Sequence, residues 1–239
     1  MKKHIKISFI TLYLVVQIFI FPDLTVAQKI LYDIYSKDKK IGSITIQLSD
    51  VAFNDTTVLK VETNTEIKVK TLFISLFSLD SQEESLINEA GTFHYNSISV
   101  TNGDTIIING NLREDEFLFD IIEGKKKQCI SIKRNQYDFT SQDSPETLLE
   151  IQGKVEVFRI LDFDKLAVVT QELKWIRNDE LYLDGEIINC KVIEFISANK
   201  KGMRWITKDK YGLLIEEQGE DEDGKYSIKI SRFREISKN

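Results

Sequence analysis

Histidine, cysteine and proline are scarce in this 239-residue sequence, which has two of each. One histidine and one proline fall within the first 27 residues, so His94 and Pro145 stand alone in the remainder. A zinc site needs several His or Cys ligands, and here only His94, Cys129 and Cys190 exist, all far apart in sequence. A Ser-His-Asp or Cys-His catalytic site would have to use His94, which sits within a strand pattern. We therefore predict no metal site and no histidine-based catalysis.

Motifs for nucleotide binding and serine hydrolysis are missing as well. The sequence contains no G-x-S-x-G, P-loop or dinucleotide fingerprint, so we expect no cofactor and no catalytic residues. Acidic residues are plentiful, however, and a carboxylate-based hydrolase stays open as an alternative. Two carboxylates in an open cleft, with pKa values pushed apart, would favour that alternative.

The two cysteines are too few for a disulfide framework. Cys190 alternates with Ile188 and Val192 along a predicted strand, which directs its thiol into the core. Cys129 is out of phase with its apolar neighbours and is expected to face the opposite side. Although an exported protein can form disulfides, this mismatch favours two free thiols.

The one long apolar run lies at the amino terminus. A lysine-rich start precedes the run Ile7–Phe21, and Thr25 and Ala27 supply small residues at −3 and −1 of a cleavage site. The run is short for a membrane span, which needs ~20 residues. We predict a signal peptide over residues 1–27 and an exported, periplasmic or extracellular domain over residues 28–239. After processing the protein is not expected to span a membrane.

Basic residues are fewer than acidic ones, with 32 Lys and Arg against 38 Asp and Glu. The whole chain carries a net charge of −6, and removing residues 1–27, with three Lys and one Asp, makes it −8. A mildly acidic domain argues against binding to nucleic acid or to an anionic membrane surface.

Period-two alternation dominates the rest of the chain. In Leu59–Lys70 the odd-numbered residues are apolar or Thr and the even-numbered residues are charged or Asn, which is typical of a strand with one buried and one wet face. Turn signals such as Asn102-Gly103 and Asp223-Gly224 recur, and Met203–Phe233 is predicted to form three strands hinged by such turns. The pattern predicts an all-β, mainly antiparallel fold.

One segment departs from this pattern. Asp143 and Glu146 have capping-box spacing, Pro145 suits a first helical turn, and Gly153 suits a helix end. We predict one short helix near 144–152 that joins two β halves of a single domain. Because this helix is too small to cover the sheet, the sheet must curl on itself into a single highly curved sheet or half-open barrel.

A hollow curl would provide a ligand cavity. The alternative for the two tryptophans is ordinary core packing. If the curl is hollow, we expect its lining to include four aromatic residues: Phe73, Phe77, Trp175 and Trp205. Such a cavity would bind an apolar or lipid-like molecule, or a segment of a partner protein of the envelope. A structural part of an envelope assembly is a further alternative.

Two motifs at the ends of the domain resemble a known family. Lys39–Gly42 resembles a "K-x-I-G" start, and Trp205–Leu213 with Asp223–Lys225 resembles a "W-Y-x-x-D-x-x-G-x-L … D-G-R" ending. Both are similar to an uncharacterised family of bacterial envelope proteins, domain of unknown function 6134, and to its larger relative 3108. Ile206 and Lys225 replace the usual Tyr and Arg, as in a divergent member. The resemblance implies a secreted, highly curved antiparallel sheet similar in outline to the LolA-type lipoprotein carriers, with no known catalytic residues.

The export prediction can be tested directly. Cleavage after Ala27 would make Gln28 the first residue of the mature protein. Intact-mass measurement of protein recovered from the periplasm should give the mass of residues 28–239. A mass that retains residues 1–27 would instead indicate an anchored protein.

Overall fold

The structure is a computed structural model that describes residues 27–71, 74–183, 185–208 and 212–236. The predicted signal peptide lies almost wholly outside these residues, so its cleavage stays a prediction. Among the described residues, no helix has the length and apolar character needed to cross a bilayer.

Most described residues belong to β-strands. They are β1 (Ala27–Ser36), β2 (Lys39–Phe53), β3 (Thr56–Thr71), β4 (Ile74–Asn88), β5 (Gly91–Thr101), β6 (Asp104–Arg113), β7 (Glu116–Glu123), β8 (Lys126–Lys133), β9 (Phe139–Thr140), β10 (Val155–Asp162), β11 (Ala167–Leu183), β12 (Glu186–Ser197), β13 (Lys200–Thr207), β14 (Leu214–Asp221) and β15 (Gly224–Ile236). Two short 3-10 helices accompany them, η1 (Arg134–Gln136) and η2 (Pro145–Leu148).

All fifteen strands form one sheet. Its order is β8-β7-β6-β5-β4-β3-β2-β1-β15-β14-β13-β12-β11-β10-β9. The chain therefore runs outward from β1 to the edge strand β8, crosses to the other edge at β9, and runs back inward to β15. Every neighbouring pair is antiparallel except β9 and β10, which are parallel. The sheet is mainly antiparallel, as predicted, and does not close into a barrel, since β8 and β9 remain its two edges.

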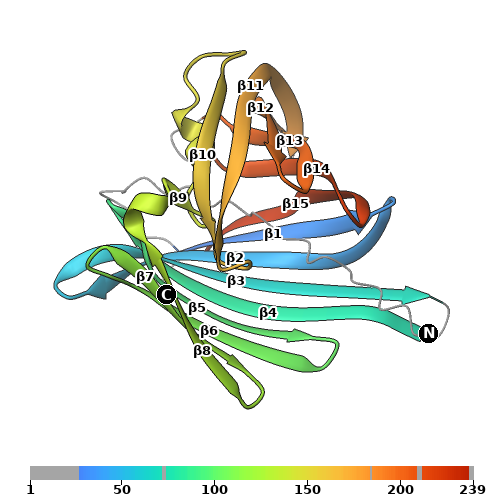
Figure 1. Ribbon diagram of the computed structural model, residues 1–239. Coiled ribbons are helices and arrows are strands. Elements are labelled where there is room, and N and C mark those ends of the chain that lie inside the picture. Colours follow the sequence, from blue (N-terminus) through green and yellow to red (C-terminus); the bar gives the residue numbers. More distant parts are fainter. Residues whose placement is uncertain (1–26, 72–73, 184, 209–211, 237–239) are drawn as a thin grey trace.

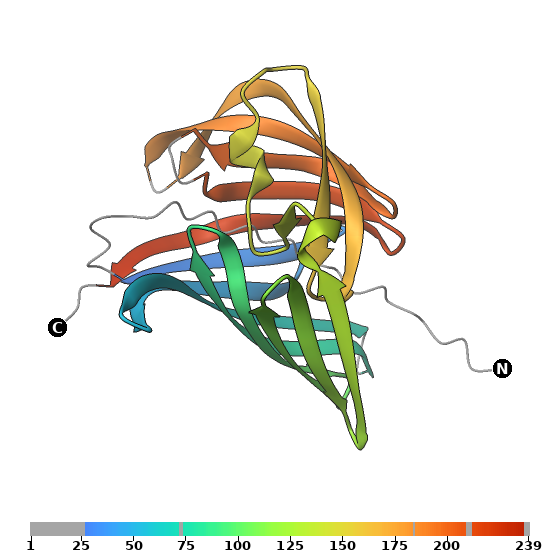
Figure 2. The same ribbon diagram turned by 60° about the vertical axis from the view of Figure 1, so that its left-hand side comes forward.

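The sheet folds into two arms. Figures 1 and 2 show β3–β8 as one arm and β10–β14 as the other, and β9 lies between them in Figure 1. The edge after β9 is fastened to the turn end of β5 by polar contacts. The Asp143 carboxylate accepts hydrogen bonds from the hydroxyls of Thr92, at 3.1 Å, and Thr140, at 3.0 Å, and from the Thr140 amide at 2.7 Å. The curl is thus closed by side chains instead of by strand pairing.

The apolar core follows from the alternation seen in the sequence. In β3, Leu59, Val61 and Ile67 are buried, whereas Asn64, Glu66 and Lys68 are exposed, so the face assignment for Leu59–Lys70 is confirmed. The main core gathers one face of the central strands, and it includes Ile30, Ile34, Ile44, Ile46, Ile193, Phe195 and Ile228.

A second cluster ties the two arms together. Phe163, which follows β10, inserts its ring against Tyr95 of the opposite arm at a centroid distance of 4.4 Å. It also lies 5.0 Å from Phe117 and 5.6 Å from Phe119. The end of β10 therefore plugs the concave face of β5–β8.

The predicted helix near 144–152 is reduced to the single 3-10 turn η2. The residues that suggested its cap are used elsewhere. Asp143 binds Thr140 and Thr92, and the Glu146 side chain turns into the core to pair with Arg204. These tertiary contacts prevail over the local preference for a helix. Gly153 does adopt a positive φ, 85°, as its sequence position suggested.

A buried charge network holds η2 against β13 and β14. Arg204, Glu217 and Glu146 are fully buried, and the Arg204 guanidinium contacts both carboxylates. Lys200 adds its ammonium to Glu217 at 2.9 Å, and Tyr226 donates a hydrogen bond to the same carboxylate at 2.7 Å. Burial alone would raise the pKa of Glu217, but Lys200 and Arg204 outweigh it and lower this pKa to about 2.

The glycine at position 219 makes room for this network. A Cβ built on Gly219 would lie 2.1 Å from the Tyr226 hydroxyl oxygen and 2.3 Å from ring carbon Cζ. No side chain therefore fits between the ring and the backbone of β14. The ring lies directly over Gly219, from where its hydroxyl reaches Glu217.

Both cysteines are free thiols, as predicted. Cys190 is buried in the main core, and Cys129 is exposed on β8. Cys129 faces away from the core because Ile130 and Ile132 occupy the inward positions of the same strand.

The buried network predicts a large loss of stability when its cation is removed. Arg204→Met leaves Glu146 buried without its counter-charge and should destabilise the protein by ~3–5 kcal/mol in urea unfolding. Lys201→Met is the matched control on the same strand, since it removes only the exposed 3.7 Å pair with Glu220 and should change stability by less than ~1 kcal/mol. Equal effects of the two substitutions would contradict this role of Arg204.

Candidate ligand-binding site

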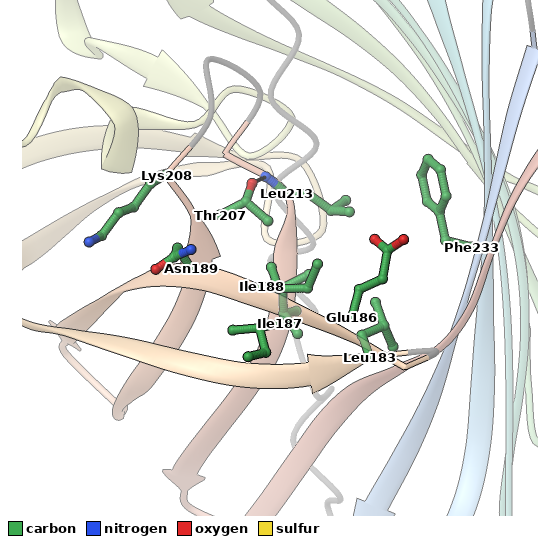
Figure 3. Close-up of a pocket in the computed structure, with 10 residues that line it drawn as sticks. Leu183, Glu186, Ile187, Ile188, Asn189, Thr207, Lys208, Leu213 and Phe233 are labelled. Carbon is green, nitrogen blue, oxygen red and sulfur yellow. Dashed lines mark hydrogen bonds between the residues drawn. The ribbon is translucent and has the colours of Figure 1, made fainter.

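The larger of two cavities described here is an apolar groove between β12, β13, β14 and β15 (Figure 3). Its volume is about 580 Å³. The apolar part of its lining consists of Leu183, Ile187, Ile188, Leu213, Ile215 and Phe233. Four polar side chains complete it: Glu186, Asn189, Thr207 and Lys208. A cavity of this size and polarity suits a small amphipathic molecule.

Backbone hydrogen bonds fix the shape of the groove at the end of β13. The amide of Thr207 donates to the Leu213 carbonyl at 2.9 Å, and the Leu213 amide donates to the Thr207 hydroxyl at 2.7 Å. The Lys208 amide donates to the Asn189 carbonyl of β12 at 3.1 Å. These bonds hold Leu213 against β13 and Lys208 against β12, so the apolar and polar parts of the lining are held together.

The groove has a polar end and an apolar end. In Figure 3, Lys208 and Asn189 lie together at one end, and Phe233 and Leu183 lie toward the other, where Glu186 is the polar neighbour. Ile187 lies between these ends and has 55 % of its surface exposed. An unusually exposed isoleucine inside a groove is available for contact with a ligand.

The second cavity, of about 270 Å³, lies on the concave face of β3–β8. We call it the concave cavity. Strand register explains its composition, because two same-face rows cross the arm. One row is Thr63, Glu83, Ser97, Ile108, Ile121 and Gln128, and the other is Thr65, Ser81, Ser99, Ile106 and Glu123. Every member of both rows lines the cavity, together with Leu79, Tyr95, Gln142, Asp164 and Leu166.

Two carboxylates of the concave cavity have raised pKa values. Burial raises the pKa of Glu83 to about 6, against hydrogen bonds from Ser81 and Tyr95 that lower it. Asp164 reaches solvent at the cavity, yet the surrounding protein and the nearby charges of Glu83 and Asp162 raise its pKa well above the ordinary value. Each carboxylate therefore disfavours ionisation of the other.

Of the four aromatic residues predicted to line a cavity, the three that the structure describes lie in the main core or against it. Phe73 lies outside the described residues. Phe77 and Trp205 belong to the main core, where 6 % and 7 % of their surfaces are exposed, and Trp175 is half-buried against it. The Trp205 indole donates to Asp179 at 3.0 Å, and the Trp175 ring lies 4.7 Å from the Lys191 ammonium. Phe77, Trp175 and Trp205 line neither of the two cavities described here.

His94 has a structural environment. Its Nδ1 lies 2.8 Å from the Asn111 side-chain oxygen, and its Nε2 lies 2.7 Å from the Asn96 side-chain nitrogen. Within the described residues, no three His, Cys, Asp or Glu side chains are grouped in a way that could hold a metal ion.

The sequence interpretation missed both cavities. For the apolar groove no local signal existed, because its lining is drawn from five strands, β11 to β15. For the concave cavity one signal was present: Thr63 and Thr65 interrupt the apolar face of β3 between Val61 and Ile67.

A comparison with known protein families identifies the family of this chain. The sequence model of Domain of unknown function (DUF6134) matches residues 32–162, just over half of the chain. The chain belongs to this family. The match includes the Lys39–Gly42 motif, whereas the motif at Trp205–Leu213 lies beyond it. No protein with a curated description is significantly similar to this sequence.

A solved structure shares the fold of this DUF6134 member. It is described as a beta-barrel-like protein of domain of unknown function DUF1849 from Brucella abortus, with a TM-score of 0.63 and 8 % sequence identity. The likeness covers 89 % of this chain and 99 % of that chain. At this identity the comparison shows the fold alone.

The raised pKa of Glu83 predicts a pH-dependent penalty to stability. The folded protein binds the Glu83 proton more tightly than the unfolded chain does, so the penalty is present above about pH 6 and is relieved as pH falls toward 4.5. Glu83→Gln should therefore raise the melting temperature at pH 7.5 by ~2–4 °C, the shift that ~1 kcal/mol gives in a chain of this size. It should give no such gain near pH 4.

Glu172→Gln is the matched control for that measurement. Glu172 is an exposed residue on β11, so the same chemical change should leave the melting temperature unaltered at both pH values. A melting temperature that falls in Glu83→Gln at pH 7.5 would contradict the prediction.

Proposed function

We propose that this protein is an exported, non-catalytic binding protein and that the apolar groove holds a single-chain, lipid-like molecule. The observation that carries the proposal is the groove itself, with six apolar side chains around a volume of about 580 Å³. The beta-barrel-like fold of the chain and of its structural neighbour fits a binding protein.

The distribution of charge suggests how such a molecule lies. Lys208 and Asn189 supply a cation and an amide at one end of the groove, which suits a carboxylate head group. From there an alkyl chain runs past Ile188 and Leu213 toward Phe233. Burial of apolar surface supplies the affinity, and the polar end sets the orientation.

The alternative is a carboxylate-based hydrolase, and the concave cavity provides two carboxylates for it. Glu83 and Asp164 share the concave cavity, as such an enzyme would require. A retaining glycosidase, however, keeps one carboxylate ionised as nucleophile while the other acts as acid. Here the pKa values of both carboxylates move upward. The structure therefore marks neither carboxylate as the acid or as the nucleophile, and we favour binding because of the apolar groove.

The test uses a fluorescent fatty-acid probe, 11-(dansylamino)undecanoic acid, with the mature protein. Ile187→Ser removes apolar surface from the groove without opening the core and should weaken binding about fivefold. Val157→Ser is the matched control, because Val157 is 58 % exposed on β10 and lies outside the groove. Lys208→Gln should weaken binding of the fatty acid but not of the corresponding alcohol.

The same titration tests the aromatic residues predicted from the sequence. Because Trp205 is largely buried, Trp205→Phe is the suitable change, and truncation to alanine would disturb the core. A loss of affinity in Trp205→Phe with none in Ile187→Ser would move the ligand to the aromatic site. No binding of the probe by the unmodified protein would overturn the lipid proposal and leave a partner segment or an envelope assembly as the function.

A further inference from the structure

The concave cavity carries a second inference, independent of the lipid proposal. The inward face of a curled sheet normally packs apolar side chains, as β1 and β2 do here with Ile30, Ile34, Ile44 and Ile46. On β3, β4 and β5 the same face instead presents hydroxyl groups toward the cavity. These belong to Thr63, Thr65, Ser81, Ser97 and Ser99. Polar groups at inward positions are expensive to bury unless they meet a partner.

The charge of the cavity is one-sided. Its lining includes the carboxylates of Glu83, Glu123 and Asp164 and no Lys, Arg or His. The nearest lysines are already engaged, since Lys165 pairs with Asp162 at 3.4 Å and Lys200 pairs with Glu217 at 2.9 Å. Within the described part of the chain, none of the three lining carboxylates takes part in an ion pair.

Among the buried hydroxyl-bearing residues of the lining, Thr65 is the one whose hydroxyl has no hydrogen bond within the described part of the chain. Thr65 has only 6 % of its surface exposed, and that surface borders the cavity. Its side chain makes no hydrogen bond with any other described residue, whereas Ser81 of β4 and Ser97 of β5 bond to Glu83 and Tyr95. A hydroxyl at the surface of the cavity is available to bond to a ligand that enters it.

From these three observations we propose that the concave cavity binds a small organic cation, with its ammonium group between Glu83 and Asp164. The ammonium supplies the positive charge that the lining of the cavity lacks. Its N–H groups donate hydrogen bonds to the carboxylates. The hydroxyls of Thr65 and Ser99 bond to a polar substituent of the ligand. Ile106, Ile108 and Ile121 form the apolar wall against its carbon chain.

The geometry favours an organic cation over a metal ion. No three acidic, His or Cys side chains of the described residues converge on one point, as a metal ion would require. An ammonium group on a short carbon chain instead satisfies separate carboxylates and also covers the apolar wall. A volume of about 270 Å³ limits the ligand to a small molecule.

The proposal is tested by isothermal titration at pH 7.5 with 1,4-diaminobutane, using 1,4-butanediol as its uncharged counterpart. The diamine should bind and the diol should not. Glu83→Gln and Asp164→Asn should each weaken diamine binding at least ~10-fold. Thr65→Val should weaken the binding of a hydroxylated amine, 1,3-diamino-2-propanol, more than that of the diamine. Glu172→Gln, outside the cavity, should change neither.

The pH dependence provides a second readout. Three further charged groups act on Asp164, the neighbour of Glu83: Asp162 at the end of β10, Lys165 in the β10–β11 turn and Lys200 of β13. Glu123 and the phenol of Tyr95 share the cavity lining with Glu83. A proton on Glu83 competes with the cation, so affinity should fall about tenfold between pH 7.5 and pH 5.

Three results would overturn the proposal. They are equal binding of diamine and diol, unchanged diamine affinity in both Glu83→Gln and Asp164→Asn, and no diamine binding by the unmodified protein. Thermal melting of each variant confirms that it folds, and both amide substitutions remove a like charge, so neither is expected to impair folding. Fatty-acid binding in the groove should be unaffected by these variants, which separates this inference from the lipid proposal.

Discussion

A single layer of β-sheet has to bury its own apolar face, and this constraint shapes the whole molecule. The described residues contain no helix longer than the four residues of η2, so nothing of helical form can serve as a second layer. The sheet therefore bends until its two arms face each other, with Phe163 of one arm packed on Tyr95 and Phe117 of the other. The curvature is a consequence of hydrophobic burial without a partner layer.

Polar contacts complete what hydrophobic packing begins. The edge strand β9 has two residues and pairs with β10, and hydrogen bonds among Thr92, Thr140 and Asp143 fasten it to β5 of the opposite arm. On the other side of the same segment, Glu146 reaches Arg204 in the core. A buried ion pair adds little net stability compared with apolar packing, but it strongly disfavours any arrangement that leaves one charge alone. The segment after β9 is thus held in one position between the arms.

The sequence allowed the hairpins to be predicted because their signals are local. Turn residues such as Asn102 and Gly103 adopt the positive φ angles, 52° and 96°, that their types favour, and alternation in β3 identified the buried face correctly. Long-range features carried no such signal. The pairing of β1 with β15 joins the two ends of the described chain, and the Arg204–Glu146 contact spans 58 positions. That contact also explains why the capping-box pattern at Asp143–Glu146 yielded one 3-10 turn instead of a helix.

The candidate sites were also not predictable from the sequence, because they too depend on long-range contacts. Aromatic residues were expected to line a cavity because large rings are common in ligand pockets, yet Trp205 and Phe77 are packed in the core, where their burial contributes most to stability. The cavities are lined by aliphatic and hydroxyl side chains instead. Thr63 and Thr65 are good strand formers, so each fits the alternating pattern without marking anything unusual. Only the strand register shows that these two residues lie beside Glu83, Ser81, Ser97 and Ser99. Together the six side chains form a polar wall. The pairing of neighbouring strands decides which polar side chains lie next to each other, so such a site can be recognised only when the strand register is known. A site of this kind needs neither histidine nor cysteine.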